Sequence, residues 1–399
     1  MFLLVTGHQG SGGTGDDGAG DGDGSESASG DIPEDASGGA DIPADIPADI
    51  SADISTHARA ARRVRGRVLK ATGLVLAGAL VLGVGAAGWA YWRLNDNIRS
   101  VDINSALGDD RPAKAPDTPS SDASAPAPTL PAGPLNILVL GSDSRGGAEN
   151  RELGGGDGTG ARADTAMVVH LDAGRTGATV VSIPRDTRVD RPACPLPDGG
   201  ATRPVRGAMF NSAYAVGGPV CAVKTVESLT EVRMDHYVEI DFAGFRDLVD
   251  ALGGVTVTTD EDIDDERSRL RLEAGTHHLD GTDALALART RYGVGDGSDL
   301  GRIGLQHRLV KALLERIAEQ DLLTDPVKLY EAADALTGGL TTDTGLDSLS
   351  ELVGFGRSLK DLTPAGVTTL TLPVRPAPWD GNRVVPDEPE AGELWASLR

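Results

Sequence analysis

A run of 22 residues without a charged side chain, 71–92, constrains this chain more than any other feature of its sequence. A helix rises about 1.5 Å per residue, so a run of that length spans about 33 Å, enough to cross the hydrocarbon of a bilayer. Arg and Lys crowd residues 59–70 just before the run, and Trp89 and Trp92 stand near its far end. Basic residues favour the cytoplasmic side and aromatic rings favour the headgroups. We predict a single transmembrane helix at 71–92, with the amino terminus in the cytoplasm.

A cleaved signal peptide is the alternative, but the run starts too late in the chain and is too long for one. Residues 1–58 hold 12 Asp or Glu and no Lys or Arg, so we expect a disordered acidic cytoplasmic tail. Residues 59–70 form a basic juxtamembrane segment, and the Pro- and Ala-rich residues 93–133 are expected to form a stalk. The formal net charge of −23 argues against nucleic acid as a partner, because phosphate binding needs a cationic surface.

From residue 134 the hydrophobic pattern alternates between short apolar runs and helical spacing. The short runs predict strands at 135–141, 166–171, 178–183 and 367–372. Helical spacing predicts helices at 242–252, 282–290, 301–318, 325–336 and 346–359. We therefore predict an α/β fold for residues 134–378, one large extracytoplasmic domain with a central mixed β-sheet flanked by helices on both faces. Residues 379–399 are expected to be a C-terminal tail.

Both cysteines, Cys194 and Cys221, fall in the part of the chain that this topology places outside the cell. Disulfides persist in that compartment, so we predict that the two cysteines pair. Two free buried thiols are the alternative, which the spacing alone does not exclude. A zinc site lacks support, because no further His or Cys stands at ligand spacing from them.

Four short segments place charge at the ends of predicted strands and helices. They are 141–145, 162–165, 183–187, and the pair Arg289 and Arg291 followed by Asp299 and Arg302. Ligands bind at the ends of strands in α/β sheets, so the four segments are candidates for one site. Each segment alone is equally compatible with a solvated loop or a local Asp–Arg pair.

The helix predicted at 301–318 gives an independent indication, because its faces follow from the helical period. Arg302 and Gln306 fall within the apolar stripe, whereas Arg308 and Lys311 fall on the opposite face. An inward arginine needs an anionic partner, since an unpaired buried charge is costly. That partner is either a ligand anion or an acidic residue of the protein.

Five arginines are candidates for an anion site, Arg162, Arg185, Arg289, Arg291 and Arg302. Planar guanidinium groups match phosphate oxygens two at a time, so a phosphate or pyrophosphate is the natural ligand. Two carboxylates, Asp143 and Asp164, suit a hard cation such as Mg²⁺, which keeps water and phosphate oxygens as its other ligands. A nucleophilic role for Ser142 or Ser144 stays open.

These segments resemble the LytR-CpsA-Psr family. The resemblance rests on 141–145, 162–165, 183–187, 211–219, 236–255, 279–281 and 289–291, which occur in order over most of residues 134–310. Members of that family attach cell-wall glycopolymers to peptidoglycan, moving the polymer with one phosphate from a polyprenyl-pyrophosphate carrier to a sugar hydroxyl. The inside-to-outside anchor agrees with the usual topology of the family.

The resemblance implies roles for the matched residues. Asp143 and Asp164 would hold Mg²⁺, and one of them would serve as base for the incoming hydroxyl. Arg162 and Arg289 would join them in catalysis, and the pyrophosphate would be held by Arg162, Arg185, Arg289, Arg291, Arg302 and Gln306. Two alternatives remain, a polyprenyl-pyrophosphate phosphatase that uses the same site and a noncatalytic protein that binds wall glycan or lipid.

Overall fold

The computed structural model describes residues 48–114, 133–143, 163–294, 297–320 and 325–399. The predicted membrane helix is part of helix α1 (Ala48–Asn97). Its segment Leu74–Asn97 is long and apolar enough to cross a membrane, and its large apolar side chains are mostly exposed. The helix begins within the segment expected to be a disordered tail, and residues 1–47 lie outside the described residues. Gly7–Gly88 and Trp89–Arg399 belong to separate compact units.

The unit that contains Trp89–Arg399 is built on a mixed sheet. Its strands, among the described residues, run in the order β1 (Arg99–Val101), β12 (Leu340–Asp343), β7 (His236–Asp241), β2 (Leu135–Ser142), β3 (Ala163–Leu171), β4 (Ala178–Ser182) and β13 (Val367–Thr371). Strand β2 pairs antiparallel with β3 and parallel with β7. The four strands predicted from short apolar runs are confirmed as β2, β3, β4 and β13. Three of them are buried central strands, which carry the densest apolar pattern, whereas β13 lies at the edge of the sheet.

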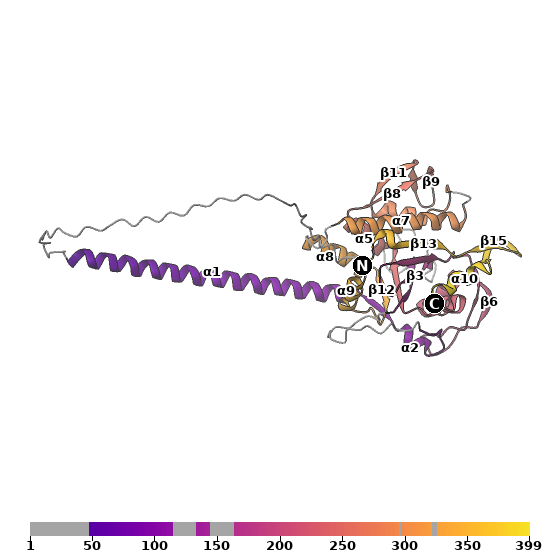
Figure 1. The fold of residues 1–399 in the computed structure, drawn as a ribbon, viewed down its shortest axis with the longest axis horizontal. Coiled ribbons are helices and arrows are strands. Elements are labelled where there is room, and N and C mark those ends of the chain that lie inside the picture. Colours follow the sequence, from indigo (N-terminus) through magenta and orange to yellow (C-terminus); the bar gives the residue numbers. More distant parts are fainter. Residues whose placement is uncertain (1–47, 115–132, 144–162, 295–296, 321–324) are drawn as a thin grey trace, which may run out of the picture. The chain divides into compact units, whose positions relative to one another are not determined.

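Helices cover both faces of this sheet. Leu138 and Leu140 of β2 face one side, whereas Leu135 and Ile137 face the other, as the strand period requires. The first face packs against α2 (Ile103–Leu107), α4 (Asn211–Thr230) and α10 (Glu390–Ala396), and the second against α9 (Leu349–Ser358). In Figure 1, α2 lies on one side of β3 and α7 (Asp299–Glu319) on the other. The predicted α/β architecture is confirmed.

A further apolar cluster joins α7 to α5 (Phe242–Ala251) and α6 (Gly281–Arg289). Two small antiparallel pairs complete it, β8 (Val255–Thr259) with β11 (Gly275–Leu279), and β9 (Ile263–Asp265) with β10 (Leu270–Leu272). Helix α8 (Pro326–Gly338) packs against α5. All five helices predicted in this domain are confirmed within a few residues.

Two segments predicted to lie outside the folded domain belong to it. Residues 98–111 were expected within the stalk, yet Ile103 and Leu107 are buried in the core and Arg111 forms a buried ion pair with Glu227 at 2.6 Å. The predicted C-terminal tail is also wrong. Its residues form β15 (Asp380–Pro386), which pairs with β14 (Val374–Ala377), and α10, whose Trp395 is buried. Apolar residues are scattered among charged and polar ones in both segments, so only tertiary burial identifies them as folded.

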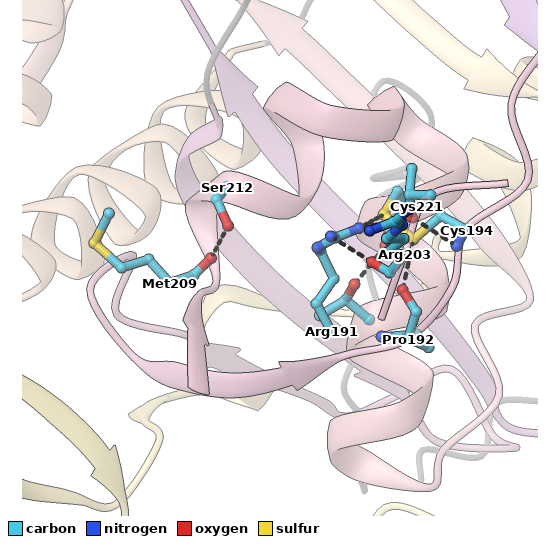
Figure 2. The surroundings of a disulfide bond; sticks show 9 residues. Arg191, Pro192, Cys194, Arg203, Met209, Ser212 and Cys221 are labelled. Atoms are coloured by element: carbon cyan, nitrogen blue, oxygen red, sulfur yellow. Dashed lines mark hydrogen bonds between the residues drawn. A yellow bond between two sulfur atoms is a disulfide. The ribbon is translucent and has the colours of Figure 1, made fainter. Parts of the chain in front are cut away.

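Cys194 and Cys221 form a disulfide, as predicted. It ties the connection between β5 (Arg188–Arg191) and β6 (Val205–Met209) to α4, as Figure 2 shows. Arg191 donates to the carbonyl oxygen of Arg203 at 2.8 Å in the same region. Helix α4 is kinked at Gly217, where a Cβ atom would lie 2.7 Å from the Cβ atom of Cys221. Only glycine therefore fits at that position beside the disulfide.

Candidate functional site

A cavity of about 360 Å³ lies between the sheet and helices α5, α6 and α7. Its apolar lining consists of Val139, Leu140, Met167, Ile240, Phe242, Phe245, Leu248, Leu285, Ala288, Leu309, Val310 and Leu313. The charged and polar lining residues are Asp164, Thr165, Arg185, Arg289, Arg291, Arg302 and Gln306. We call the four arginines of this set the arginine cluster. A cavity with both kinds of lining suits a ligand that has an apolar part and an anionic part.

Asp164 enters the cavity through an irregularity in the sheet. Gly141 pairs with Thr165, but the next residue, Ser142, pairs with Ala163, so Asp164 is the extra residue of a β-bulge. A bulge redirects a side chain that would otherwise follow the strand alternation. Gly141 allows this close pairing, because a Cβ atom at that position would lie 3.2 Å from the Cβ atom of Thr165.

Arg185 joins Asp164 to the start of α7. Its Nη1 donates to Oδ1 of Asp164 at 2.6 Å, and its main-chain N–H donates to Oδ2 of Asp299 at 3.0 Å. Burial acts to lower the pKa of Arg185, but the carboxylates of Asp164 and Asp299 outweigh it and the pKa is raised. This guanidinium is therefore held firmly in its charged form at the cavity wall.

Arg302 and Gln306 point inward from α7, as the helix-face argument predicts, and both are almost fully buried. Arg302 forms an ion pair with Asp299 at 2.6 Å and donates to the main-chain carbonyl of Asp164 at 2.8 Å. Gln306 donates to the hydroxyl of Thr165 at 2.9 Å. The acidic partner that the sequence left open thus exists within the protein, one helical turn from Arg302.

Arg289 and Arg291 follow α6 and complete the cluster. The Arg289 guanidinium lies 5.0 Å from the ring centre of Phe242, on the apolar wall. Burial lowers the pKa of Arg289 from its ordinary value, although the negative charges of Asp164 and Asp143 act against this effect. Arg291 lies 3.8 Å from the carboxylate of Asp186. Arg289 therefore places a cation against the apolar wall of the cavity.

The acidic residues that the structure describes around the arginine cluster do not accept hydrogen bonds from all of its N–H groups. The Nε–H groups of Arg185, Arg291 and Arg302 are buried and, among the described residues, have no hydrogen-bond partner. The side chains of Arg185 and Arg291 are nevertheless 21% and 26% exposed, so other N–H groups of these guanidiniums can donate to a bound anion. Phosphate oxygens accept charge-assisted hydrogen bonds of this kind.

The structure brings six of the predicted site residues to the lining of one cavity, Asp164, Arg185, Arg289, Arg291, Arg302 and Gln306. Asp143 follows directly on β2, beside the bulge. Arg162 and Ser144 lie outside the described residues. Ser142 is fully buried and its hydroxyl donates to Glu239, which is incompatible with a nucleophile open to substrate.

Some residues of this site had no role in the sequence analysis. Asp299 and Asp186 were noted only as neighbours of the arginines, and they prove to be ion-pair partners of Arg302 and Arg291. The apolar lining was not separable from the core, because the same Leu, Ile and Val residues serve both. For a metal ion, no group of three or more His, Cys, Asp or Glu that could hold one is found within the described residues.

The fold and the site together define an α/β domain in which an arginine cluster lines one side of a largely apolar cavity. The chain belongs to the LytR_cpsA_psr family, whose family model matches residues 90–399. The matched range includes every described strand and the whole arginine cluster.

Individual relatives agree with this assignment. The probable cell wall biosynthesis protein LcpB of Corynebacterium glutamicum is 34% identical over 272 residues, which cover 66% of this chain and 61% of that protein. The polyisoprenyl-teichoic acid–peptidoglycan teichoic acid transferase TagT of Bacillus subtilis is 30% identical over 330 residues, covering 77% of this chain and 92% of that protein. A solved LytR-Csp2A-Psr enzyme from Actinomyces oris is 26% identical with a TM-score of 0.53, covering 75% of this chain and 95% of that chain. The chain thus spans less than two thirds of LcpB.

Proposed function

We propose that this protein moves a glycopolymer phosphate from a polyprenyl-pyrophosphate carrier to a sugar hydroxyl of peptidoglycan. The observation that carries the proposal is the direct contact between the arginine cluster and an apolar cavity, which matches a diphosphate attached to a hydrocarbon chain. The apolar lining would bind a segment of the polyprenyl chain, and the arginines would bind the two phosphates. The names of LcpB and TagT support a reaction of this class.

In the proposed reaction, the oxygen of the acceptor hydroxyl attacks the phosphorus that carries the polymer. A new P–O bond forms, the P–O bond to the bridging oxygen breaks, and polyprenyl monophosphate leaves. The hydroxyl proton passes to a carboxylate, Asp143 or Asp164. The arginine cluster holds the diphosphate and stabilises the charge that develops on the leaving phosphate, so positioning and electrostatics supply the catalysis.

Magnesium is part of this proposal. Asp143 and Asp164 lie at the ends of adjacent strands and both act on Arg289, and two carboxylates are enough for an ion that takes its remaining ligands from water and phosphate. When bound, Mg²⁺ would neutralise charge on the diphosphate. We also propose that α1 is a single-pass anchor with its amino terminus in the cytoplasm and the domain outside, which brings the site to a substrate that resides in the membrane.

The test uses the full chain in detergent micelles with a polyprenyl-pyrophosphate-linked glycan, uncrosslinked peptidoglycan strands and Mg²⁺. We expect glycan phosphate covalently bound to peptidoglycan, with release of polyprenyl monophosphate. Arg289→Ala should abolish transfer, whereas Arg308→Ala, on the exposed face of α7, should retain it.

Glycan phosphate released into water, with none on peptidoglycan, would instead identify a phosphatase. Donor binding without turnover would identify a noncatalytic binding protein. Chelation of divalent cations tests the metal separately, since transfer that survives chelation would exclude a role for Mg²⁺.

A further inference from the structure

A chain of ion pairs leads from the arginine cluster to the hairpin formed by β14 and β15. Asp186 is its central link, because its carboxylate lies 3.8 Å from Arg291, which lines the cavity, and 3.1 Å from Arg383 of β15. Arg383 and Asp186 do not themselves line the cavity. The contacts therefore run outward from the proposed diphosphate site to the hairpin, whose second strand, β15, was expected to be part of a C-terminal tail.

Several contacts hold this hairpin in place. Arg188 of β5 pairs with Asp380 at 3.6 Å, and Thr187 forms a parallel bridge with Val384. After the hairpin, Trp395 and Leu398 are buried in the main core. The hairpin is thus fixed to the domain on both sides, and β15 lies at the edge of the domain in Figure 1.

The turn of this fixed hairpin presents Trp379 to solvent, with 69% of the residue exposed. Among the described residues after α1, this is the largest exposed fraction of any large apolar side chain. Arg188 and Arg383 both reach Asp380, the residue after Trp379, at 3.6 and 3.9 Å, and their side chains are 26% and 31% exposed. An exposed indole beside partly exposed guanidinium groups can bind a ligand that has both an apolar face and polar oxygens.

The chemistry of the site indicates which ligand this is. Attacking and leaving oxygens lie roughly in line in phosphoryl transfer, so the acceptor approaches from the side opposite the leaving polyprenyl phosphate. The apolar cavity would hold the leaving lipid, and the ion pairs through Asp186 lead away from that cavity. A pyranose ring has a C–H face that packs on an aromatic ring, and its hydroxyl and amide oxygens accept hydrogen bonds from guanidinium groups.

We propose that Trp379 and Arg383 form a subsite for the acceptor glycan strand of the cell wall. This inference rests on the proposed transfer reaction, because it assigns the second substrate of the same site. Trp379 would stack against one sugar of the strand while Arg383 binds its oxygens. Asp186 would transmit the position of the hairpin to Arg291.

The test measures binding and transfer separately in the full chain in detergent micelles. The probe is a soluble, uncrosslinked peptidoglycan glycan strand, and its affinity is measured by calorimetry without any donor. We expect Trp379→Ala to weaken binding and raise the acceptor KM roughly tenfold, which corresponds to about 1.4 kcal/mol, with the donor KM unchanged. Trp379→Phe, which keeps a ring, should restore most of the affinity.

Val327→Ala is the matched control, since Val327 is 63% exposed on α8 and its loss should change neither quantity. Equal glycan affinity and equal acceptor KM in Trp379→Ala and the unmodified protein would overturn the proposal. The same holds if Trp379→Phe binds as weakly as Trp379→Ala. If glycan binding depends on Trp379 but no transfer occurs, the subsite stands and the proposed reaction fails.

Discussion

The guanidinium of Arg302 donates to the main-chain carbonyl of Asp164 at 2.8 Å, although 138 residues separate them in the sequence. The carbonyl belongs to the bulged residue of β3, whose side chain accepts from Arg185. Arg302 also pairs with Asp299, which in turn binds the main chain of Arg185. Helix α7 therefore fixes the position of the carboxylate at the cavity, so the arginines proposed to bind the diphosphate also have a structural role.

Arg302→Ala should therefore lower stability as well as activity. We expect the free energy of unfolding to fall by about 2 to 3 kcal/mol, because Asp299 is buried and, among the described residues, would keep only Arg185 as a cationic partner. Urea denaturation of the purified chain measures this change. Arg308→Ala on the same helix is the control, since its pair with Asp260 is exposed and should contribute about 1 kcal/mol at most. Equal stability of the two variants would contradict the structural role of Arg302.

The sequence was sufficient to predict the elements that carry strong local patterns. Strands β2 and β4 are dense apolar runs, and the inward position of Arg302 and Gln306 follows from the helical period. The charged residues at the ends of the predicted strands and helices were enough to identify the arginine cluster, because charge directly beside a buried apolar run is easy to recognise in a sequence.

The remaining features depend on contacts that no local pattern encodes. Leu309 lines the cavity and also packs in the apolar cluster around α7, so its pattern is that of any core leucine. Arg383 stands in a segment rich in Pro and charge, and only the pairing of β15 brings it to Asp186. The bulge at Asp164 could not be predicted from the sequence either, because strand register depends on tertiary contacts.

Removing the disulfide should lower stability without abolishing donor binding. Cys194 and Cys221 are 27 residues apart, so their bond closes a moderate loop, and we expect Cys194→Ser with Cys221→Ser to cost about 3 kcal/mol. Urea denaturation of the double variant measures this cost. Neither cysteine lines the cavity, so affinity for a polyprenyl pyrophosphate should be unchanged. An unchanged unfolding midpoint would show that the covalent link contributes nothing to stability.

Alkaline pH should destabilise the domain through two tyrosines, the buried Tyr237 and the half-buried Tyr214. Tyr214 and Tyr237 both donate to the buried carboxylate of Glu239, and burial together with that negative charge raises their pKa above the ordinary value of 10.0. The folded state therefore keeps protons that the unfolded state releases, so this stability is complete below about pH 10 and is lost as the pH rises further.

Urea midpoints measured from about pH 9 to about pH 11 should show this loss, and Tyr214→Phe should reduce its slope because one raised pKa is removed. Tyr292→Phe is the control, as Tyr292 is 43% exposed and does not contact Glu239. A slope that is the same in all three proteins would show that these phenols are not coupled to folding.

The segment before β2 should be required for stability, because Arg111 is the main partner of a buried acid. Its guanidinium pairs with Glu227 of α4 at 2.6 Å and donates to the carbonyl of Met234 at 2.7 Å, with both side chains of the pair almost fully buried. Arg111→Ala would leave Glu227 buried without that cation, so we expect a loss of about 3 kcal/mol in the free energy of unfolding. Arg99→Ala, at an exposed position of β1, should cost far less. Equal urea midpoints for Arg111→Ala and the unmodified chain would show that this residue does not stabilise the domain. The predicted stalk would then include it, and the domain would begin after it.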